Sequence, residues 1–155
     1  MKKIFSRRSL MGRFECIVRL VLGCIFLAGA LPKIRQPYDF LDDVYRYELV
    51  GPKVGMLVAM ALPWTELLVG ICLLGSVFVG GALLVSAGLG AIFTLAVSWA
   101  LFQGLDIGCG CFGASSHKIN SWTLMRAILV LFLSVVALLI WLLYLRRNTV
   151  LSPLD

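Results

Sequence analysis

Four long apolar segments constrain this chain more than any other feature of its sequence. They cover about 14–31, 54–75, 82–102 and 122–145. A helix that crosses a hydrocarbon core roughly 30 Å thick needs about 20 apolar residues, which is close to the length of each segment. Because lipid cannot hydrogen-bond the backbone, each spanning segment must satisfy its own polar groups as a helix. The sequence therefore predicts an all-α integral membrane protein that folds as a four-helix bundle.

The composition leaves little room for a soluble domain beside these segments. Of the 155 residues, 61% are hydrophobic and only 14% are charged. A soluble fold cannot hide that much apolar surface, so any chemistry is expected in the bundle or in its loops. The net charge of +6 comes from basic residues that flank the apolar segments, as membrane orientation signals do. No basic face or motif predicts a nucleic-acid partner.

The polar connection between the first two segments contains a shorter helical pattern. Phe40, Val44 and Tyr47 recur at the i, i+4 and i+7 spacing, with charged residues on the other faces. This pattern predicts a short amphipathic helix at the membrane interface, between the first and second membrane helices. Pro37 suits the first turn of this helix, and Gly51 with the proline after it ends the helix.

The charge distribution predicts how the chain is oriented. Residues 1–13 form a basic tail with five lysines and arginines, residues 14–147 form the membrane domain, and residues 148–155 form a C-terminal tail. Four spans place both termini on one side, and a dense basic tail before the first helix usually determines the cytoplasmic side. We therefore expect a multi-pass protein of the cell inner membrane with cytoplasmic termini and periplasmic loops.

The loop between the third and fourth spans contains Cys109 and Cys111, separated by Gly110. Disulfides persist in an oxidising compartment such as the periplasm, and residues i and i+2 lie about 5.5–7 Å apart at Cα, which overlaps the bridgeable range. A bridge this small is strained, and strained exposed disulfides are the labile, oxidising ones. Cys109 and Cys111 are therefore predicted to be catalytic in thiol–disulfide exchange. The alternatives are a structural loop bridge or inert thiols; a metal site is not predicted, because zinc needs four ligands and only His117 lies nearby.

Arg126 is the charged residue nearest to this pair on the fourth span. It lies about one turn into the span, on the side of the loop. A guanidinium there is predicted to stabilise a thiolate of Cys109 or Cys111. The alternative is that the long side chain only extends to the membrane interface.

Glu66 is the one acidic residue near the middle of a predicted span. An unpaired acid at that depth costs several kcal/mol, so Glu66 is a candidate functional residue. If the ends of the first two spans are level, Arg19 lies about 6 Å from Glu66 in depth, at 1.5 Å per residue. We therefore expect an Arg19–Glu66 ion pair. A proton-linked or quinone-linked role and a neutral, hydrogen-bonded carboxyl group remain as alternatives.

Several short motifs, taken in order, give the chain a family resemblance over about 14–145. They are Ala28-Gly29-Ala30-Leu31-Pro32-Lys33 at the end of the first span, Pro63-Trp64-Thr65-Glu66 in the second, Cys109-Gly110-Cys111-Phe112-Gly113 in the loop, and Ser121-Trp122-Thr123-Leu124-Met125-Arg126 in the fourth. In this order they resemble the methylamine utilisation protein MauE family, which belongs to the wider DoxX-like membrane proteins.

The resemblance implies a redox-associated membrane maturation factor. In the setting that names the family, the role is processing or disulfide formation in the small subunit of periplasmic methylamine dehydrogenase. The expected partner is a thioredoxin-like or secreted periplasmic protein, with that small subunit as one candidate. Thiol–disulfide oxidoreductase is the enzyme activity implied, although the sequence does not establish an enzyme.

Two other functional classes and one cofactor question stay open from the sequence. The chain is alternatively a non-catalytic assembly or transport factor whose cysteines only staple a loop, or a subunit of a DoxX-like oxidoreductase complex. No cofactor is established. Analogy with other four-helix thiol oxidases makes a quinone the candidate electron acceptor.

Overall fold

The computed structural model of the chain describes residues 2–47, 49, 51–104 and 121–151. Within these residues the chain forms five helices: α1 (Lys2–Arg35), α2 (Pro37–Arg46), α3 (Pro52–Gly75), α4 (Val79–Phe102) and α5 (Ser121–Leu151). Four stretches are long and apolar enough to cross a membrane, namely Glu15–Arg35, Pro52–Gly75, Val79–Phe102 and Ser121–Arg146. The predicted helical membrane bundle, with its short helix between the first two spans, is confirmed.

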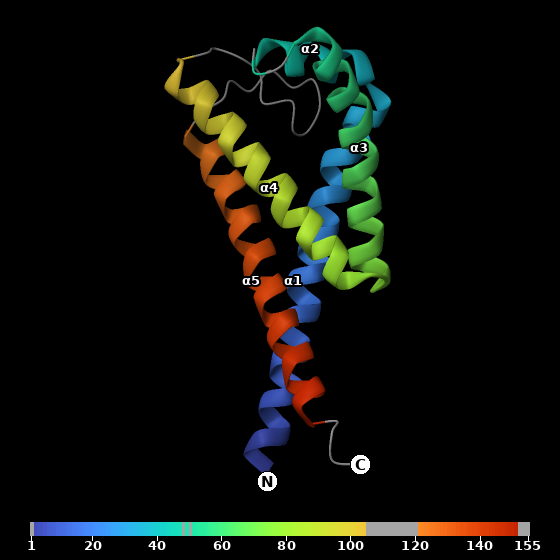
Figure 1. Ribbon diagram of the computed structural model, residues 1–155, viewed down its shortest axis with the longest axis vertical. Coiled ribbons are helices and arrows are strands. Elements are labelled where there is room, and N and C mark those ends of the chain that lie inside the picture. Colours follow the sequence, from blue (N-terminus) through green and yellow to red (C-terminus); the bar gives the residue numbers. More distant parts are fainter. Residues whose placement is uncertain (1, 48, 50, 105–120, 152–155) are drawn as a thin grey trace.

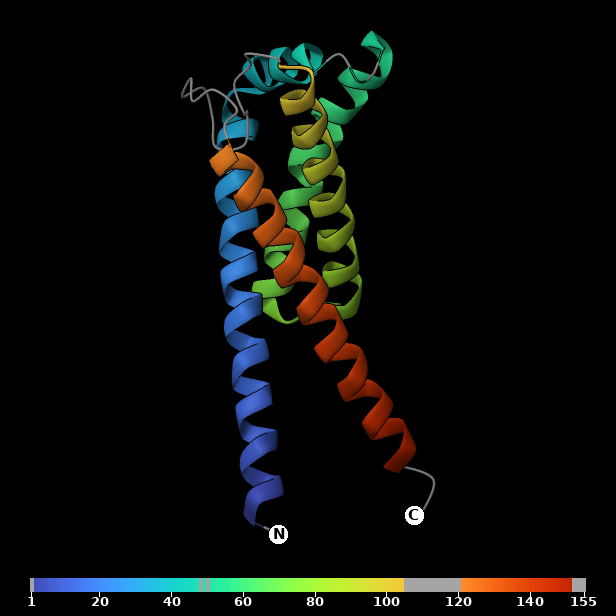
Figure 2. The same cartoon turned by 90° about the vertical axis from the view of Figure 1, so that its left-hand side faces the viewer.

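The four long helices are arranged as two antiparallel pairs. α1 packs mainly against α3, and α4 packs mainly against α5, with fewer contacts between the pairs. Both termini lie at one end of the molecule, and α2 lies across the opposite end (Figures 1 and 2). We call these the terminal end and the α2 end. The two pairs diverge toward the α2 end (Figure 1).

Two glycines set the register between α1 and α3. A Cβ atom on Gly23 would lie 3.2 Å from the backbone oxygen of Gly70, and a Cβ atom on Gly70 would lie 3.1 Å from the backbone oxygen of Gly23. Each of these atoms would also lie 2.8 Å from a leucine side chain of the opposite helix, either Leu74 or Leu27. Small residues permit this close approach of helices in membranes. Gly23 and Gly70 are therefore level with each other.

The α4–α5 pair also has a glycine at two of its contact points. The indole of Trp141 lies against Gly80, where an added Cβ atom would overlap the ring. A Cβ atom on Gly90 would lie 3.3 Å from the Cα of Leu131. Gly80 thus makes room for the indole of Trp141, and Gly90 permits close approach of the α5 backbone.

The buried side chains form one large cluster and one small cluster. The large cluster, which we call the shared core, takes residues from all four long helices: Val18, Leu22, Phe26, Val69, Leu73, Ala82, Leu83 and Ala137. The small cluster, which we call the α2-end cluster, has Val97 and Ala100 at its centre, with Phe93, Leu101, Leu124 and Tyr47 packed against them. The shared core joins the two pairs, whereas the α2-end cluster belongs mostly to α4 and α5.

The first helix differs from its predicted bounds of 14–31. It begins at Lys2 and continues through Pro32 to Arg35. Pro32 lacks an N–H group, but its own carbonyl accepts a hydrogen bond from the backbone N–H of Gln36 at 2.9 Å, so the last turn still closes. A proline removes only one helical hydrogen bond, and contact with neighbouring helices offsets that loss in a membrane bundle. Lys33 therefore belongs to a helix, not to a polar connection.

Candidate functional site

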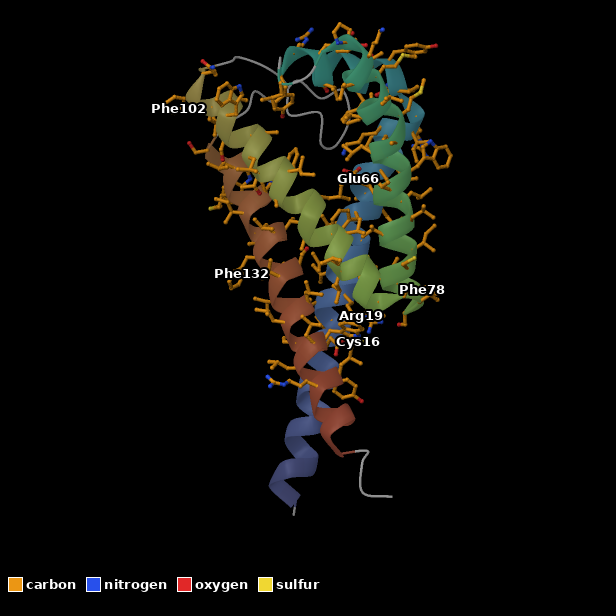
Figure 3. The ribbon with its side chains drawn as sticks, in the orientation of Figure 1. Cys16, Arg19, Glu66, Phe78, Phe102 and Phe132 are labelled. Carbon is orange, nitrogen blue, oxygen red and sulfur yellow. The ribbon has the colours of Figure 1, made fainter. Side chains whose placement is uncertain are left out.

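Lys33 and Glu66 form an ion pair between α1 and α3. The Nζ of Lys33 donates hydrogen bonds to both carboxylate oxygens of Glu66, at 2.6 Å to Oε1 and 2.8 Å to Oε2. The side chains are 6% and 14% exposed. Glu66 lies on the side of α3 that meets α1 (Figure 3). Because a buried charge is tolerated only when it is paired and hydrogen-bonded, each residue requires the other.

The register of α1 and α3 explains how two residues at different depths meet. From the level of Gly23 and Gly70, Lys33 and Glu66 both lie toward the α2 end, and their Cα atoms differ in depth by about 9 Å at a rise of 1.5 Å per residue. Helical side chains lean toward the N-terminus of their helix. The Lys33 side chain therefore extends away from the α2 end, toward Glu66.

A residue of α2 completes this site. Phe40 is the buried residue of α2, and the Nζ of Lys33 lies 5.0 Å from the centroid of its ring. An ammonium group at this distance is attracted to the face of an aromatic ring. The lysine thus connects α1 with α3 through an ion pair and with α2 through a cation–π contact. We call Lys33, Phe40 and Glu66 the ion-pair site.

The expected Arg19–Glu66 pair is wrong. The Nη1 of Arg19 lies 3.5 Å from the Oε1 of Glu15, and its Nη2 donates a hydrogen bond to the Oγ of Ser76, beyond the end of α3. From the level of Gly23, Arg19 lies about 6 Å toward the terminal end and Glu66 about 6 Å toward the α2 end; Figure 3 shows the two far apart. The expectation placed the span ends level, but the contact of Gly23 with Gly70 displaces α1 toward the terminal end relative to α3.

Tyr47 connects α2 to the α4–α5 pair. It is the C-terminal cap of α2, and its ring packs against the cluster of Val97 and Ala100. Its hydroxyl is buried and has no hydrogen-bond partner among the described residues. Burial raises the pKa of Tyr47 to about 12, and the nearby charge of Asp43 adds to this effect. The i, i+4, i+7 pattern predicted that Tyr47 faces apolar surroundings, but not that those surroundings belong to α4.

Arg126 lies near the start of α5, at the α2 end. Its guanidinium carbon lies 5.5 Å from the ring centroid of Trp122, and both side chains are exposed. This geometry fits a cation–π pair at the membrane interface. Cys109 and Cys111 lie outside the described residues, so the predicted role of Arg126 beside a thiolate stays a prediction. The segment that carries the cysteines connects Gly104, after α4, with Ser121, at the start of α5.

The same stretch of chain that carries these sites matches a family model. Residues 11–143 match the model described as "Methylamine utilisation protein MauE". The chain belongs to the MauE family. The matched region contains the ion-pair site, Tyr47, Arg126 and the Cys-Gly-Cys segment.

Curated relatives of the MauE family agree with this assignment. The chain is 30% identical over 74% of its length to the methylamine utilization protein MauE of Paracoccus denitrificans, covering 62% of that protein. It is 31% identical over 70% of its length to the protein of the same name from Methylophilus methylotrophus, covering 59% of that protein. The chain thus spans about three fifths of the length of these relatives. No solved structure matches the chain.

Three further cysteines of this MauE-family chain lie within the described residues. Cys16 and Cys24 are exposed on α1, and Cys72 is partly buried on α3; all three are free thiols. Cys72 packs against the shared core, as a small hydrophobic residue does. Among the described residues, no group of three His, Cys, Asp or Glu side chains is placed to hold a metal ion.

Sequence reasoning identified Glu66 but missed Lys33 and Phe40. The signal for Lys33 was the acid itself, because a carboxylate inside a span requires a cation within reach. The predicted first span ends at residue 31, which places Lys33 in the polar connection. The pattern places Phe40 on the apolar face of the interfacial helix and indicates no partner for it.

Proposed function

We propose that this chain is a membrane factor of methylamine utilisation that carries out thiol–disulfide exchange with a periplasmic protein. The observation that carries the proposal is the Cys109-Gly110-Cys111 sequence, which lies within the region matched by the MauE family model. The ends of the two helices that flank this segment, Phe102 of α4 and Ser121 of α5, both lie at the α2 end (Figure 1). That end is opposite to the termini, which supports a site facing the periplasm when the basic N-terminal tail is cytoplasmic.

The exchange we propose follows ordinary disulfide chemistry. A thiolate of the partner attacks one sulfur of a Cys109–Cys111 disulfide, and the other sulfur leaves as a thiolate. A second partner thiolate then resolves the mixed disulfide. The partner has lost two electrons and two protons to form its disulfide, and the cysteine pair has gained them as two thiols. A quinone in the membrane is the acceptor class that would take both electrons and both protons and restore the pair.

We assign Arg126 and Glu66 supporting roles in this function. Arg126 carries a positive charge near the start of α5 and would stabilise the thiolate that leaves during exchange. Glu66 is engaged by Lys33 through both carboxylate oxygens. This double engagement favours a positioning role for Glu66, which holds α1, α3 and α2 together, over proton transfer.

The proposed partner is a thioredoxin-like or secreted protein of the periplasm. The small subunit of methylamine dehydrogenase is one candidate, because the curated relatives are named for methylamine utilisation. The proposed location is the cell inner membrane, with cytoplasmic termini.

Serine variants of the cysteines test the proposal. Cys109→Ser and Cys111→Ser are expected to insert into membranes normally and to abolish oxidation of a reduced thioredoxin-like protein. The oxidation is measured by alkylating the free thiols that remain on that protein. Cys16→Ser and Cys24→Ser are the matched controls, because both cysteines are exposed on α1, and they are expected to leave oxidation unchanged. If both loop variants oxidise the probe as fast as the parent, the exchange function is wrong.

The same variants distinguish exchange from a structural staple. Exchange is reversible, so the remaining thiol of Cys111→Ser or Cys109→Ser is expected to attack the disulfide of an oxidised partner. The resulting mixed disulfide accumulates, because the second loop cysteine that would release the partner is absent, and it is seen as a reducible adduct on a gel. A staple predicts no adduct and a lower stability of the membrane protein.

A further inference from the structure

The two helix pairs are joined differently at their two ends. In the middle of the molecule, the shared core binds α1 and α3 to α4 and α5. At the α2 end the pairs diverge, and α2 lies across that end (Figure 1). α2 itself packs against α1 and α3. It is therefore part of the α1–α3 half, and among the described residues its contact with the other half is made by the residue that caps its C-terminal end.

Tyr47, the capping residue, makes that contact. In the α2-end cluster, every other described member comes from α4 or α5. Val97 and Ala100, on which the ring packs, are each 0% exposed. Tyr45, two residues earlier, contacts α3 instead. Its hydroxyl donates a hydrogen bond to the carbonyl of Pro52, and its ring lies against Gly55. The two tyrosines thus hold α2 to different halves of the molecule.

The connection between the halves at the other end is a short turn. Ser76 and Phe78, between α3 and α4, have φ values of 58° and 48°, in the left-handed region that is unfavourable for residues other than glycine. Phe78 is 85% exposed, so its ring makes little contact with the rest of the described chain. Arg19 of α1 donates a hydrogen bond to the Oγ of Ser76, which connects the turn to α1. Figure 3 shows Arg19 and Phe78 below Glu66, with α1 and α5 extending farther toward the termini.

We propose that Tyr47 is a latch between the two halves, which pivot about the turn at 76–78. With the latch closed, the ring of Tyr47 holds the ends of α4 and α5 against α2. With the latch open, the α4–α5 pair moves away from α2 while the shared core and the Arg19–Ser76 hydrogen bond keep the pivot together. Because the contact is apolar and the hydroxyl makes no hydrogen bond to the described residues, the latch opens without breaking a polar interaction among them. This inference does not depend on the exchange chemistry.

Distances between spin labels test the latch in the full chain with its native cysteines replaced by serine. Labels at Tyr38 and Phe102, which are 82% and 90% exposed, report the separation between α2 and the end of α4. Labels at Tyr38 and Val54, both in the α1–α3 half, report whether α2 stays on its own half. Tyr47→Ala is expected to lengthen and broaden the Tyr38–Phe102 distance distribution and to leave the Tyr38–Val54 distribution unchanged.

Further variants separate the ring from its surroundings. Tyr47→Phe keeps the ring and is expected to give the parent distribution for both label pairs. Tyr45→Ala removes a contact within one half and is expected to leave the mean Tyr38–Phe102 distance at the parent value. Val97→Ala removes the surface that receives the ring and is expected to act like Tyr47→Ala.

The latch is overturned if Tyr47→Ala leaves the Tyr38–Phe102 distribution as in the parent. It is also overturned if the Tyr38–Val54 distribution changes by as much, because Tyr47 would then be needed to hold α2 to its own half. If Tyr47→Ala does not fold, Val97→Ala alone decides between these outcomes. Since no thiol exchange is measured, failure of the latch and failure of the proposed function are distinguishable.

Discussion

Lys33, in the last turn of α1, engages both carboxylate oxygens of Glu66 on α3, at 2.6 and 2.8 Å. The Cα atoms of the two residues lie at different depths, and the long lysine side chain spans the difference. Phe40 of α2 covers the same ammonium group. One lysine therefore connects three helices at the α2 end.

Loss of the carboxylate of Glu66 is expected to destabilise the bundle. Glu66→Gln leaves the ammonium of Lys33 buried without a counter-charge, and removing one partner of a buried ion pair costs about 3–5 kcal/mol. Denaturant unfolding in detergent, followed by helical circular dichroism, measures the loss. The double variant Lys33→Met/Glu66→Gln is expected to lose less than Glu66→Gln alone, because no buried charge remains. Full stability of Glu66→Gln would show that the charge is not required.

Gly70→Ala is expected to lower the stability of the protein, because the added methyl group separates α1 from α3. A Cβ atom there would lie 2.8 Å from Leu27 and 3.1 Å from the backbone of Gly23, and overpacking of this kind costs about 1–3 kcal/mol. Gly88→Ala on α4 is the matched control, because a Cβ atom there meets nothing within 4 Å. That variant is expected to be neutral or slightly stabilising, by up to about 1 kcal/mol, since alanine favours the helix. Equal melting temperatures for the two variants would contradict the close α1–α3 contact.

Removing the hydroxyl of Tyr47 is expected to leave the free energy of unfolding unchanged or to raise it. The hydroxyl is buried without a partner in the described part of the chain, and an unsatisfied buried polar group costs about 1–3 kcal/mol. Tyr47→Phe relieves this cost and keeps the ring on Val97 and Ala100. Unfolding in detergent measures the change, and a clear loss of stability would mean that the hydroxyl forms a hydrogen bond in the membrane.

The ionisation of Tyr47 is expected at unusually high pH. Its pKa is raised from 10.0 to about 12, mainly because burial disfavours the phenolate. The folded protein then binds the proton more tightly than the unfolded chain, so the stabilising effect is complete below pH 10 and is lost as the pH rises to about 12. The difference in phenolate absorbance between the parent and Tyr47→Phe gives this titration directly. A midpoint near 10 would contradict the buried position of the ring.

Much of the helical architecture is encoded in local sequence patterns. The length and hydropathy of each span predict a membrane helix because lipid demands internal hydrogen bonding. The period of Phe40 and Tyr47 predicts the interfacial helix that the structure shows over Pro37–Arg46. The need of Glu66 for a partner is equally a local matter, since an unpaired carboxylate inside a span is unfavourable at any register. The exchange role of Cys109 and Cys111 stays a prediction from their sequence.

Local patterns were thus enough to specify the membrane helices, the interfacial helix and a buried acid that needs a cation. The packing of the helices was needed to select Lys33 rather than Arg19 as that cation, and to bring Tyr47 against α4. The cause is register. Each helix carries its own pattern, but the depth at which α1 meets α3 depends on the close approach of Gly23 and Gly70, a contact between residues far apart in the chain. A shift of a few residues changes which charges can meet, and no local pattern records that shift.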